Sequence, residues 1–107
     1  YNMPILTGIY PSKRKGKRLT AYFQNPKKTI HFGSDNGFTY VDGNTKQKRD
    51  AYIARHSKSG EDWSDPLTAG TLALYLLWST PDYKKNVAHY KKHFEVKIPK
   101  GTEINKR

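Results

Sequence analysis

The chain has 107 residues, of which 35% are hydrophobic and 13% aromatic, and its formal net charge at pH 7 is +11. This length predicts one domain with a modest core, in which aromatic side chains supply much of the buried area. The absence of cysteine excludes disulfide bonds and thiolate metal sites. The longest apolar run, residues 72–78, is far shorter than the ~20 residues that a membrane-spanning helix needs.

Residues 1–18 are predicted to form an extended, flexible, basic arm. Pro4 and Pro11 disfavour helix, and the run SKRKGKR over residues 12–18 holds five basic side chains. Because like charges so close together repel one another, we expect this run to become ordered only against an anion. The bases expected to bind a nucleic acid or an acidic partner are Lys13, Arg14, Lys15, Lys17 and Arg18.

Alternating patterns after the arm predict an antiparallel sheet. The runs RLTAYFQ (18–24) and KTIHF (28–32) each place apolar residues at every second position, and Asn25-Pro26 lies between them. These two runs predict a hairpin. The short runs FTYV (38–41) and FEVKI (94–98) predict two further strands.

Three helices are predicted in the second half of the chain. Asn44 or Thr45 can cap a first helix that ends near residue 56. Asp65 as the N-cap and Pro66 at the first helical position begin a second helix that runs to about residue 79. Thr80-Pro81-Asp82 repeats this kind of start for a third helix, which carries one apolar stripe. The stripe comprises Tyr83, Val87, Tyr90 and Phe94.

Together these elements predict an α+β fold, in which a small antiparallel sheet packs with about three helices. The basic arm is expected over residues 1–18, a single domain over 19–98, and a polar C-terminal tail over 99–107. The second helix is apolar around most of its circumference. Such a helix is either the central element of the fold or partly docked against another protein.

The first helix carries a basic stripe with an aromatic residue inside it. Its members are Lys48, Arg49, Tyr52, Arg55 and His56, which share one arc of roughly 120° on a helix. Lysine and arginine can hold phosphates, and tyrosine can stack on a base or bond to a sugar. The alternative is that Tyr52 and Ile53 pack inward while the bases only solvate the rim.

Three of the nine acidic residues lie close together in a stretch without lysine or arginine. Residues 61–81 hold three acids, and the sequence on both sides is strongly basic. Asp62 and Asp65 lie just before a predicted helix start, where the helix dipole favours negative charge. We therefore interpret these acids first as helix caps.

Catalytic motifs are weak in this sequence. A metal-dependent nuclease could use His31, His56, Asp50 and Asp62, but no paired acids recur at a metal-binding spacing. His89 and His93 lie in HYKKH rather than in the HExxH pattern of zinc proteases. We therefore expect no enzymatic activity, no cofactor and no metal site.

Four sequence blocks occur in a distinctive order: IHFG (30–33), KRDAYIARH (48–56), DWSDPLTAG (62–70) and LLWSTP (76–81). Together they resemble a group of small basic proteins encoded by large double-stranded DNA viruses of algae and amoebae. The last block departs from that group, in which LLWNKP is expected. The resemblance implies a viral context, and it carries over no catalytic residue.

The resemblance also implies that residues of these blocks form one structural corner. The corner would contain Trp63, Asp65, Pro66, Gly70 and Trp78. It would bring the Arg55–His56 helix end to the start of the second helix. A buried ion pair from Arg55 to Asp62 or Asp65 would then fix the corner.

The sequence thus favours a non-enzymatic virion component, a minor capsid or capsid-lining protein made in the host cytoplasm. Its partners would be other capsid proteins, reached through extended ends and exposed aromatic residues, and DNA, reached through phosphate contacts. The alternative is a sequence-nonspecific nucleic-acid-binding protein that acts in genome packaging or expression. The charge does not distinguish DNA from an acidic protein as the target of the basic face.

Overall fold

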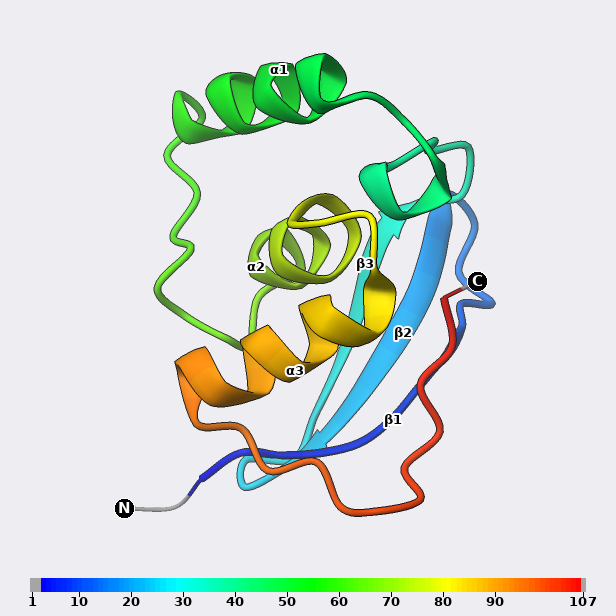
Figure 1. The fold of residues 1–107 in the computed structure, drawn as a ribbon. Helices are drawn as coiled ribbons and strands as arrows, with labels where there is room; N and C mark the ends of the chain where they lie inside the picture. The colour runs from blue at the N-terminus through cyan, green and yellow to red at the C-terminus, as the bar shows by residue number, and fades with distance from the viewer. Residues whose placement is uncertain (1–2, 107) are drawn as a thin grey trace.

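The computed structural model describes residues 3–106 and has an α+β fold, which confirms the predicted class. A three-stranded antiparallel sheet has the order β1-β2-β3, and the helices lie on one side of it (Figure 1). The strands are β1 (Ile5–Pro11), β2 (Lys17–Gln24) and β3 (Lys28–Ser34). The helical elements are the 3-10 turn η1 (Tyr40–Asp42), α1 (Lys46–Ser57), α2 (Ala69–Leu72), the π-helical segment η2 (Ala73–Trp78) and α3 (Tyr83–Phe94).

The predicted hairpin is confirmed as β2 and β3. Leu19 pairs with Phe32 and Ala21 pairs with Ile30, so the apolar positions of both strands share one face. The side chains of Leu19, Ala21 and Phe32 are fully buried on that face. The period of two in the sequence therefore reports correctly which side of the sheet meets the core.

The flexible arm predicted for residues 1–18 is wrong from residue 5 onward. Ile5–Pro11 forms β1, which pairs antiparallel with β2, and Leu6 and Ile9 are fully buried. The register shifts between Leu6 and Gly8, so the two core residues are three positions apart rather than two. This bulge hides the strand from a search for simple alternation.

The C-terminal tail is also part of the fold. It runs beside the free edge of β1 (Figure 1), where Ile9 and Ile104 form a parallel bridge. The Ile9 N–H donates to the Glu103 carbonyl at 2.9 Å, and the Asn105 N–H donates to the Ile9 carbonyl at 3.0 Å. These bonds cover part of an edge that would otherwise be open to pairing with another chain.

The two short strands predicted at 38–41 and 94–98 are wrong in most of their length. Residues 40–42 form η1, because the Asp42 carboxylate accepts the Thr39 N–H at 2.9 Å and tightens the chain into a turn. Residues 94–95 end α3, with Glu95 in the left-handed conformation. Within the described chain, only an isolated bridge from Lys97 to Ile5 continues the sheet there.

The first and third predicted helices are confirmed, and the second begins later than expected. The Thr45 hydroxyl accepts the Lys48 N–H at the start of α1, and Asp82 caps α3. Asp65 instead accepts the Leu67 N–H at 2.9 Å, which closes a turn before the helix. The cap of α2 is Thr68, whose hydroxyl accepts the Thr71 N–H.

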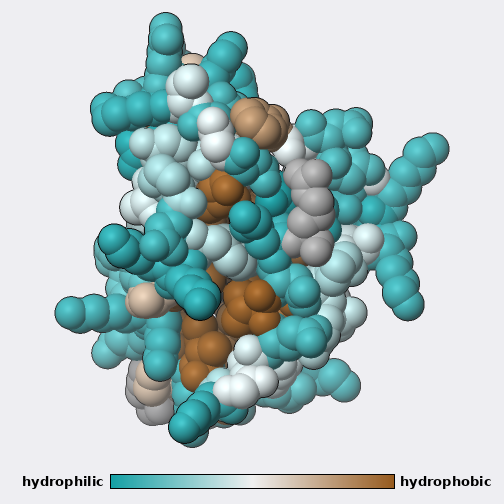
Figure 2. All heavy atoms as spheres, turned by 45° about the vertical axis from the view of Figure 1, so that its right-hand side comes forward, coloured by the Kyte–Doolittle hydropathy of each residue, from teal (hydrophilic) through white to brown (hydrophobic). Residues whose placement is uncertain are grey.

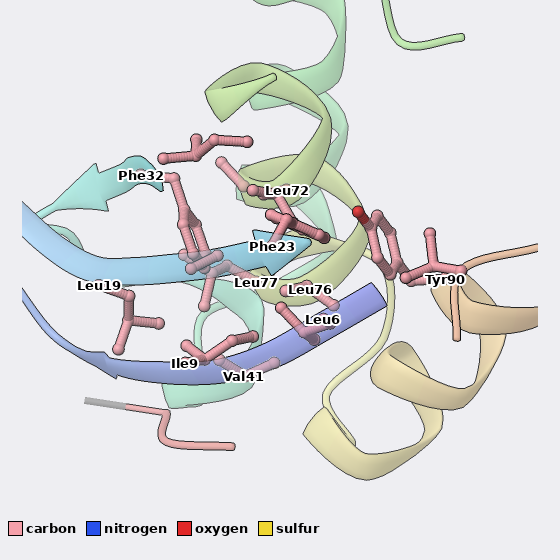
Figure 3. Close-up of a cluster of buried hydrophobic side chains, with 14 residues drawn as sticks. Leu6, Ile9, Leu19, Phe23, Phe32, Val41, Leu72, Leu76, Leu77 and Tyr90 are labelled. Atoms are coloured by element: carbon pink, nitrogen blue, oxygen red, sulfur yellow. The ribbon is translucent and has the colours of Figure 1, made fainter. Parts of the chain in front are cut away.

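The core lies between the inner face of the sheet and the helices α2, η2 and α3. Figure 3 shows Leu72, Leu76 and Leu77 of the central helix pointing toward Leu6, Phe23 and Phe32 of the sheet. Tyr90 of α3 closes one side of this cluster and is fully buried. The second predicted helix is therefore central to the fold. No helix within residues 3–106 combines the length and apolar character needed to cross a membrane.

Candidate functional site

A pocket of about 380 Å³ lies between α1, the ends of β2 and β3, and the central helix. It brings together side chains from segments that are far apart in the sequence. Six of the residues singled out from the sequence line it: Lys17, Tyr52, Arg55, His56, Gly70 and Trp78. The pocket therefore brings together candidates from the N-terminal run, the first helix and the predicted corner.

Aromatic rings form one wall of this pocket. Tyr52 stacks on Trp78, with ring centroids 4.6 Å apart and an interplanar angle of 11°. The His56 ring lies on Tyr52 at 4.1 Å. Burial in this stack raises the pKa of Tyr52 to about 12, and the nearby Glu61 charge adds to the effect. Tyr52 thus faces inward, as in the alternative interpretation of the helix stripe.

A histidine–carboxylate pair forms the polar side of the pocket. The His56 Nδ1 atom lies 3.1 Å from a Glu61 carboxylate oxygen. A side chain at position 70 would contact this carboxylate at 3.1 Å, so Gly70 leaves the room that Glu61 occupies. Sequence reasoning missed Glu61, because the neighbouring Asp62 and Asp65 carry the helix-cap signal.

The other two bases of the predicted α1 stripe, Arg49 and Lys48, differ in their contacts. The Arg49 guanidinium Nε atom donates to the carbonyls of Trp78 at 3.0 Å and Ser79 at 3.2 Å, which ties α1 to the end of η2. Lys48 is exposed. The two bases therefore differ in environment, since Arg49 is bonded within the fold and Lys48 is open to solvent.

The bases of the run 12–18 also differ in their exposure to solvent. Lys13, Arg14 and Lys15 are exposed in the loop between β1 and β2, whereas Arg18 is buried. The Arg18 guanidinium makes two hydrogen bonds to the Asp42 carboxylate, at 2.7 and 3.0 Å. Arg18 therefore holds η1 against the sheet and is not free for a partner.

The Arg18–Asp42 pair also changes the acidity of the carboxyl. Burial by itself would raise the pKa of Asp42, but hydrogen bonds from Arg18 and Thr39 outweigh this effect. With the Arg18 charge they lower the pKa to about 2. The Arg18 Nε atom also donates to the Lys106 carbonyl at 2.9 Å, so the same side chain fixes the C-terminal segment.

The ion pair predicted from Arg55 to Asp62 or Asp65 is not formed in the structure of residues 3–106. The ion pairs among the described residues do not include Arg55, whose guanidinium lies 5.9 Å from the Tyr52 ring centre. His56 and Glu61 make the contact between the helix end and the following loop instead. Pro66 takes part through its carbonyl, which accepts the Tyr90 hydroxyl at 2.7 Å. Trp63 is partly buried in the same loop.

The four residues of the nuclease alternative are not brought together. His31 contacts the hydroxyls of Ser12 and Thr20 on the outer side of the sheet. Asp50 pairs with Lys46 and Arg49, and Asp62 accepts hydrogen bonds from Ser64. Each has its own set of partners, so the structure offers no shared centre for these groups.

The pocket can hold an anionic group. Lys17 and Arg55 line it with two positive charges against the single carboxylate of Glu61, which is paired with His56. The rings of Tyr52 and Trp78 offer apolar surface beside them. The Gly33 and Gly37 backbone also reaches the pocket wall. A phosphate or an acidic side chain suits these surroundings in charge, and aromatic rings favour a planar group next to it.

Comparison with known proteins places the chain in a viral family. The model of a family of unknown function (DUF5754) matches residues 8–56. An uncharacterized protein of Acanthamoeba polyphaga mimivirus is 35% identical over 86 residues, which cover 73% of this chain and 85% of that protein. No solved structure matches the chain. The chain therefore belongs to the family of this mimivirus protein, and a viral origin is supported.

Proposed function

We propose that this protein is a non-enzymatic virion component, a minor capsid or capsid-lining protein whose basic surface contacts the packaged genome. The observation that carries this proposal is how few of the 20 lysines and arginines form ion pairs within the fold, which has a net charge of +11. Among the described residues, the lysines and arginines in ion pairs are Arg18, Lys46 and Arg49. The other bases leave a positive field that a polyanion can neutralise.

The exposed bases are spread over several surfaces. They occupy the loop between β1 and β2, the outer side of α1 and the outer side of α3. Examples from each are Lys15, Lys48 and Lys92. The face in Figure 2 is mostly hydrophilic, with hydrophobic residues in a strip near its centre. Such a distribution favours contacts to phosphates on several sides over the reading of one base sequence.

Protein docking in the shell would use other features. The N-terminal segment is paired in the sheet from residue 5 onward, and the C-terminal segment is bonded beside it as far as residue 106. Docking by long flexible ends is therefore not supported. Exposed aromatic residues remain available, and Phe38, which is 59% exposed, is the most exposed of these. The pocket with Lys17 and Arg55 would receive an acidic group of a neighbouring shell protein.

Location tests this proposal directly. Mass spectrometry would follow the protein through purified particles, before and after high salt strips the shell from the genome. Retention with the shell is the expected result. Release with the DNA would favour the alternative, a nucleic-acid-binding protein of packaging or expression. Absence from purified particles would overturn the virion role.

The salt dependence of DNA binding tests the genome contact itself. Binding to phosphates weakens as salt rises, and its slope falls with each lost phosphate contact. Replacing Lys13, Arg14 and Lys15 by glutamine should flatten that slope without unfolding the protein, since all three are exposed. Arg18 must stay, because its loss would leave Asp42 without its buried partner.

A further inference from the structure

The two faces of the sheet differ in what covers them. The helices cover the inner face, while the outer face carries two rows of cross-strand neighbours. One row is Tyr10, Thr20 and His31, and the other is Gly8, Tyr22 and Thr29. Tyr10 is 39% exposed and Tyr22 is 42% exposed. Two large aromatic side chains thus remain in solvent on a surface without a covering helix in the described chain.

The ring of Tyr10 lies along its own strand, over Gly8. A Cβ atom at position 8 would overlap the Tyr10 ring, so glycine is needed for this arrangement. The ring meets Tyr22 at a centroid distance of 5.9 Å and an angle of 62°. Covering a glycine with an aromatic ring stabilises a sheet, which accounts for the buried side of Tyr10. It does not account for the exposed sides of both rings.

A third ring is held at the same face. The His31 Nδ1 atom lies 2.8 Å from the Thr20 hydroxyl and 3.0 Å from the Ser12 hydroxyl. Thr20 is only 2% exposed, so this contact is anchored in the sheet. Histidine and tyrosine are both side chains on which unpaired bases stack.

The three strands and the two turns that join them carry only basic charges. The loop with Lys13, Arg14 and Lys15 follows directly after β1, and Lys27 lies in the turn between β2 and β3. The three strands contain no aspartate or glutamate. Aromatic rings between basic residues combine the two contacts that a nucleic-acid strand offers, base faces and phosphates.

We propose that the outer face of the sheet binds single-stranded nucleic acid, with bases stacked on Tyr10 and Tyr22 and phosphates at Lys13, Arg14 and Lys15. A duplex cannot use the rings in this way, because its base faces are already stacked on one another. This inference rests on the proposed contact with nucleic acid. It does not depend on a location in the virus particle.

The test measures binding of the full chain to three fluorescent probes, oligo-dT and oligo-rU of about 16 nucleotides and a duplex of equal length. Stacking on an aromatic residue contributes roughly 1–3 kcal/mol per base, a factor of about 5 to 150 in affinity. Tyr22→Thr should therefore weaken single-strand binding by about tenfold and leave duplex binding unchanged. The two single-stranded probes distinguish DNA from RNA as the preferred strand.

Matched variants keep the test decisive. Tyr22→Phe and Tyr10→Phe retain the rings and should bind as the natural chain does. Phe38→Ala removes an exposed ring outside the sheet and should also bind normally. Tyr10→Ala uncovers Gly8 and can unfold the sheet, but Tyr22→Thr keeps a residue suited to a strand and decides the question alone.

Two results would overturn the inference. One is single-strand affinity that does not change in Tyr22→Thr, and the other is an equal loss for single strands and duplex. If the protein is absent from particles but the ring effect is present, the virion role alone fails. If the protein is present in the shell and the ring effect is absent, the inference about the sheet face alone fails.

Discussion

The helices α1 and α3 follow the same local rules and yet have different places in the molecule. Each has 12 residues, an N-cap side chain that accepts a backbone N–H, and basic residues in its last turn. α3 buries Asn86 and Tyr90, whereas α1 buries no residue. Figure 1 shows α1 away from the sheet and α3 across it. Caps and charges therefore specify a helix, and the apolar stripe decides whether it joins the core.

The attachment of each helix shows the same contrast. Asn86 of α3 is fully buried and donates to the carbonyls of Leu76 and Thr80, both at 2.9 Å. α1 is held from outside, through Arg49 and Tyr52 on the end of η2 and through His56 on Glu61. The pocket lies beneath α1, so the less firmly attached helix forms its wall.

The largest expected effect is at Tyr90, in the core contact of α3. Tyr90→Ala removes a buried ring and the hydrogen bond to the Pro66 carbonyl, so the free energy of unfolding should fall by about 3–5 kcal/mol. Urea unfolding measures this change. Tyr90→Phe keeps the ring and should cost about 1 kcal/mol. If Tyr90→Ala lowered the free energy of unfolding less than Tyr52→Ala does, α1 rather than α3 would be the more firmly attached helix.

The next effect concerns the Arg18–Asp42 pair, which anchors η1 just before α1. The pKa of Asp42 is lowered to about 2 in the folded chain, so the unfolded chain binds this proton first as the pH falls. Stability from this group is complete above about pH 4 and is lost between about pH 4 and pH 2, by about 2 kcal/mol. Unfolding curves across this range measure the loss.

Asp42→Asn provides the control for that pH dependence. The variant should be less stable at pH 7, because Arg18 is buried and keeps no carboxylate partner. It should also lose the acid-dependent part of the wild-type curve. An unchanged acid slope in the variant would assign the effect to other carboxyl groups.

The sequence predicts the parts of this fold that follow a single local rule. Alternation finds β2 and β3, and caps find α1 and α3. β1 is missed because its bulge places Leu6 and Ile9 out of alternation. The start of α2 is missed because Asp65-Pro66 and Thr68 both offer a cap, and only the tertiary packing selects Thr68.

The candidate site is predicted in part for a similar reason. The α1 residues Tyr52, Arg55 and His56 are one helical face, which a helical period detects. Glu61 and Lys17 reach the same pocket from a loop and a strand. No local pattern connects such segments, since their proximity depends on how the sheet packs against η2. Likewise, the outer sheet face becomes visible only once β1 is known to pair with β2.

A smaller effect is expected at Tyr52, the aromatic attachment of α1. Tyr52→Ala removes the stack on Trp78, and the unfolding free energy should fall by about 1–2 kcal/mol. Hydrogen exchange should accelerate in the amides of α1 and remain slow in those of α3. Equal acceleration in both helices would show that α1 is as much a part of the cooperative core as α3.

The smallest effect is expected at Glu61, which lies in the loop after α1 and contacts the last turn of that helix. The His56–Glu61 pair is partly exposed, so Glu61→Gln should cost at most about 1 kcal/mol. The informative result is the position of the change along the helix. Amide hydrogen exchange should accelerate in the last turn of α1 and not in its first turn, which Thr45 caps. Asp62→Asn is the matched control, because Asp62 bonds to Ser64 within its own loop. If both variants loosened the helix end equally, its attachment would depend on the acidity of the loop rather than on the contact with His56.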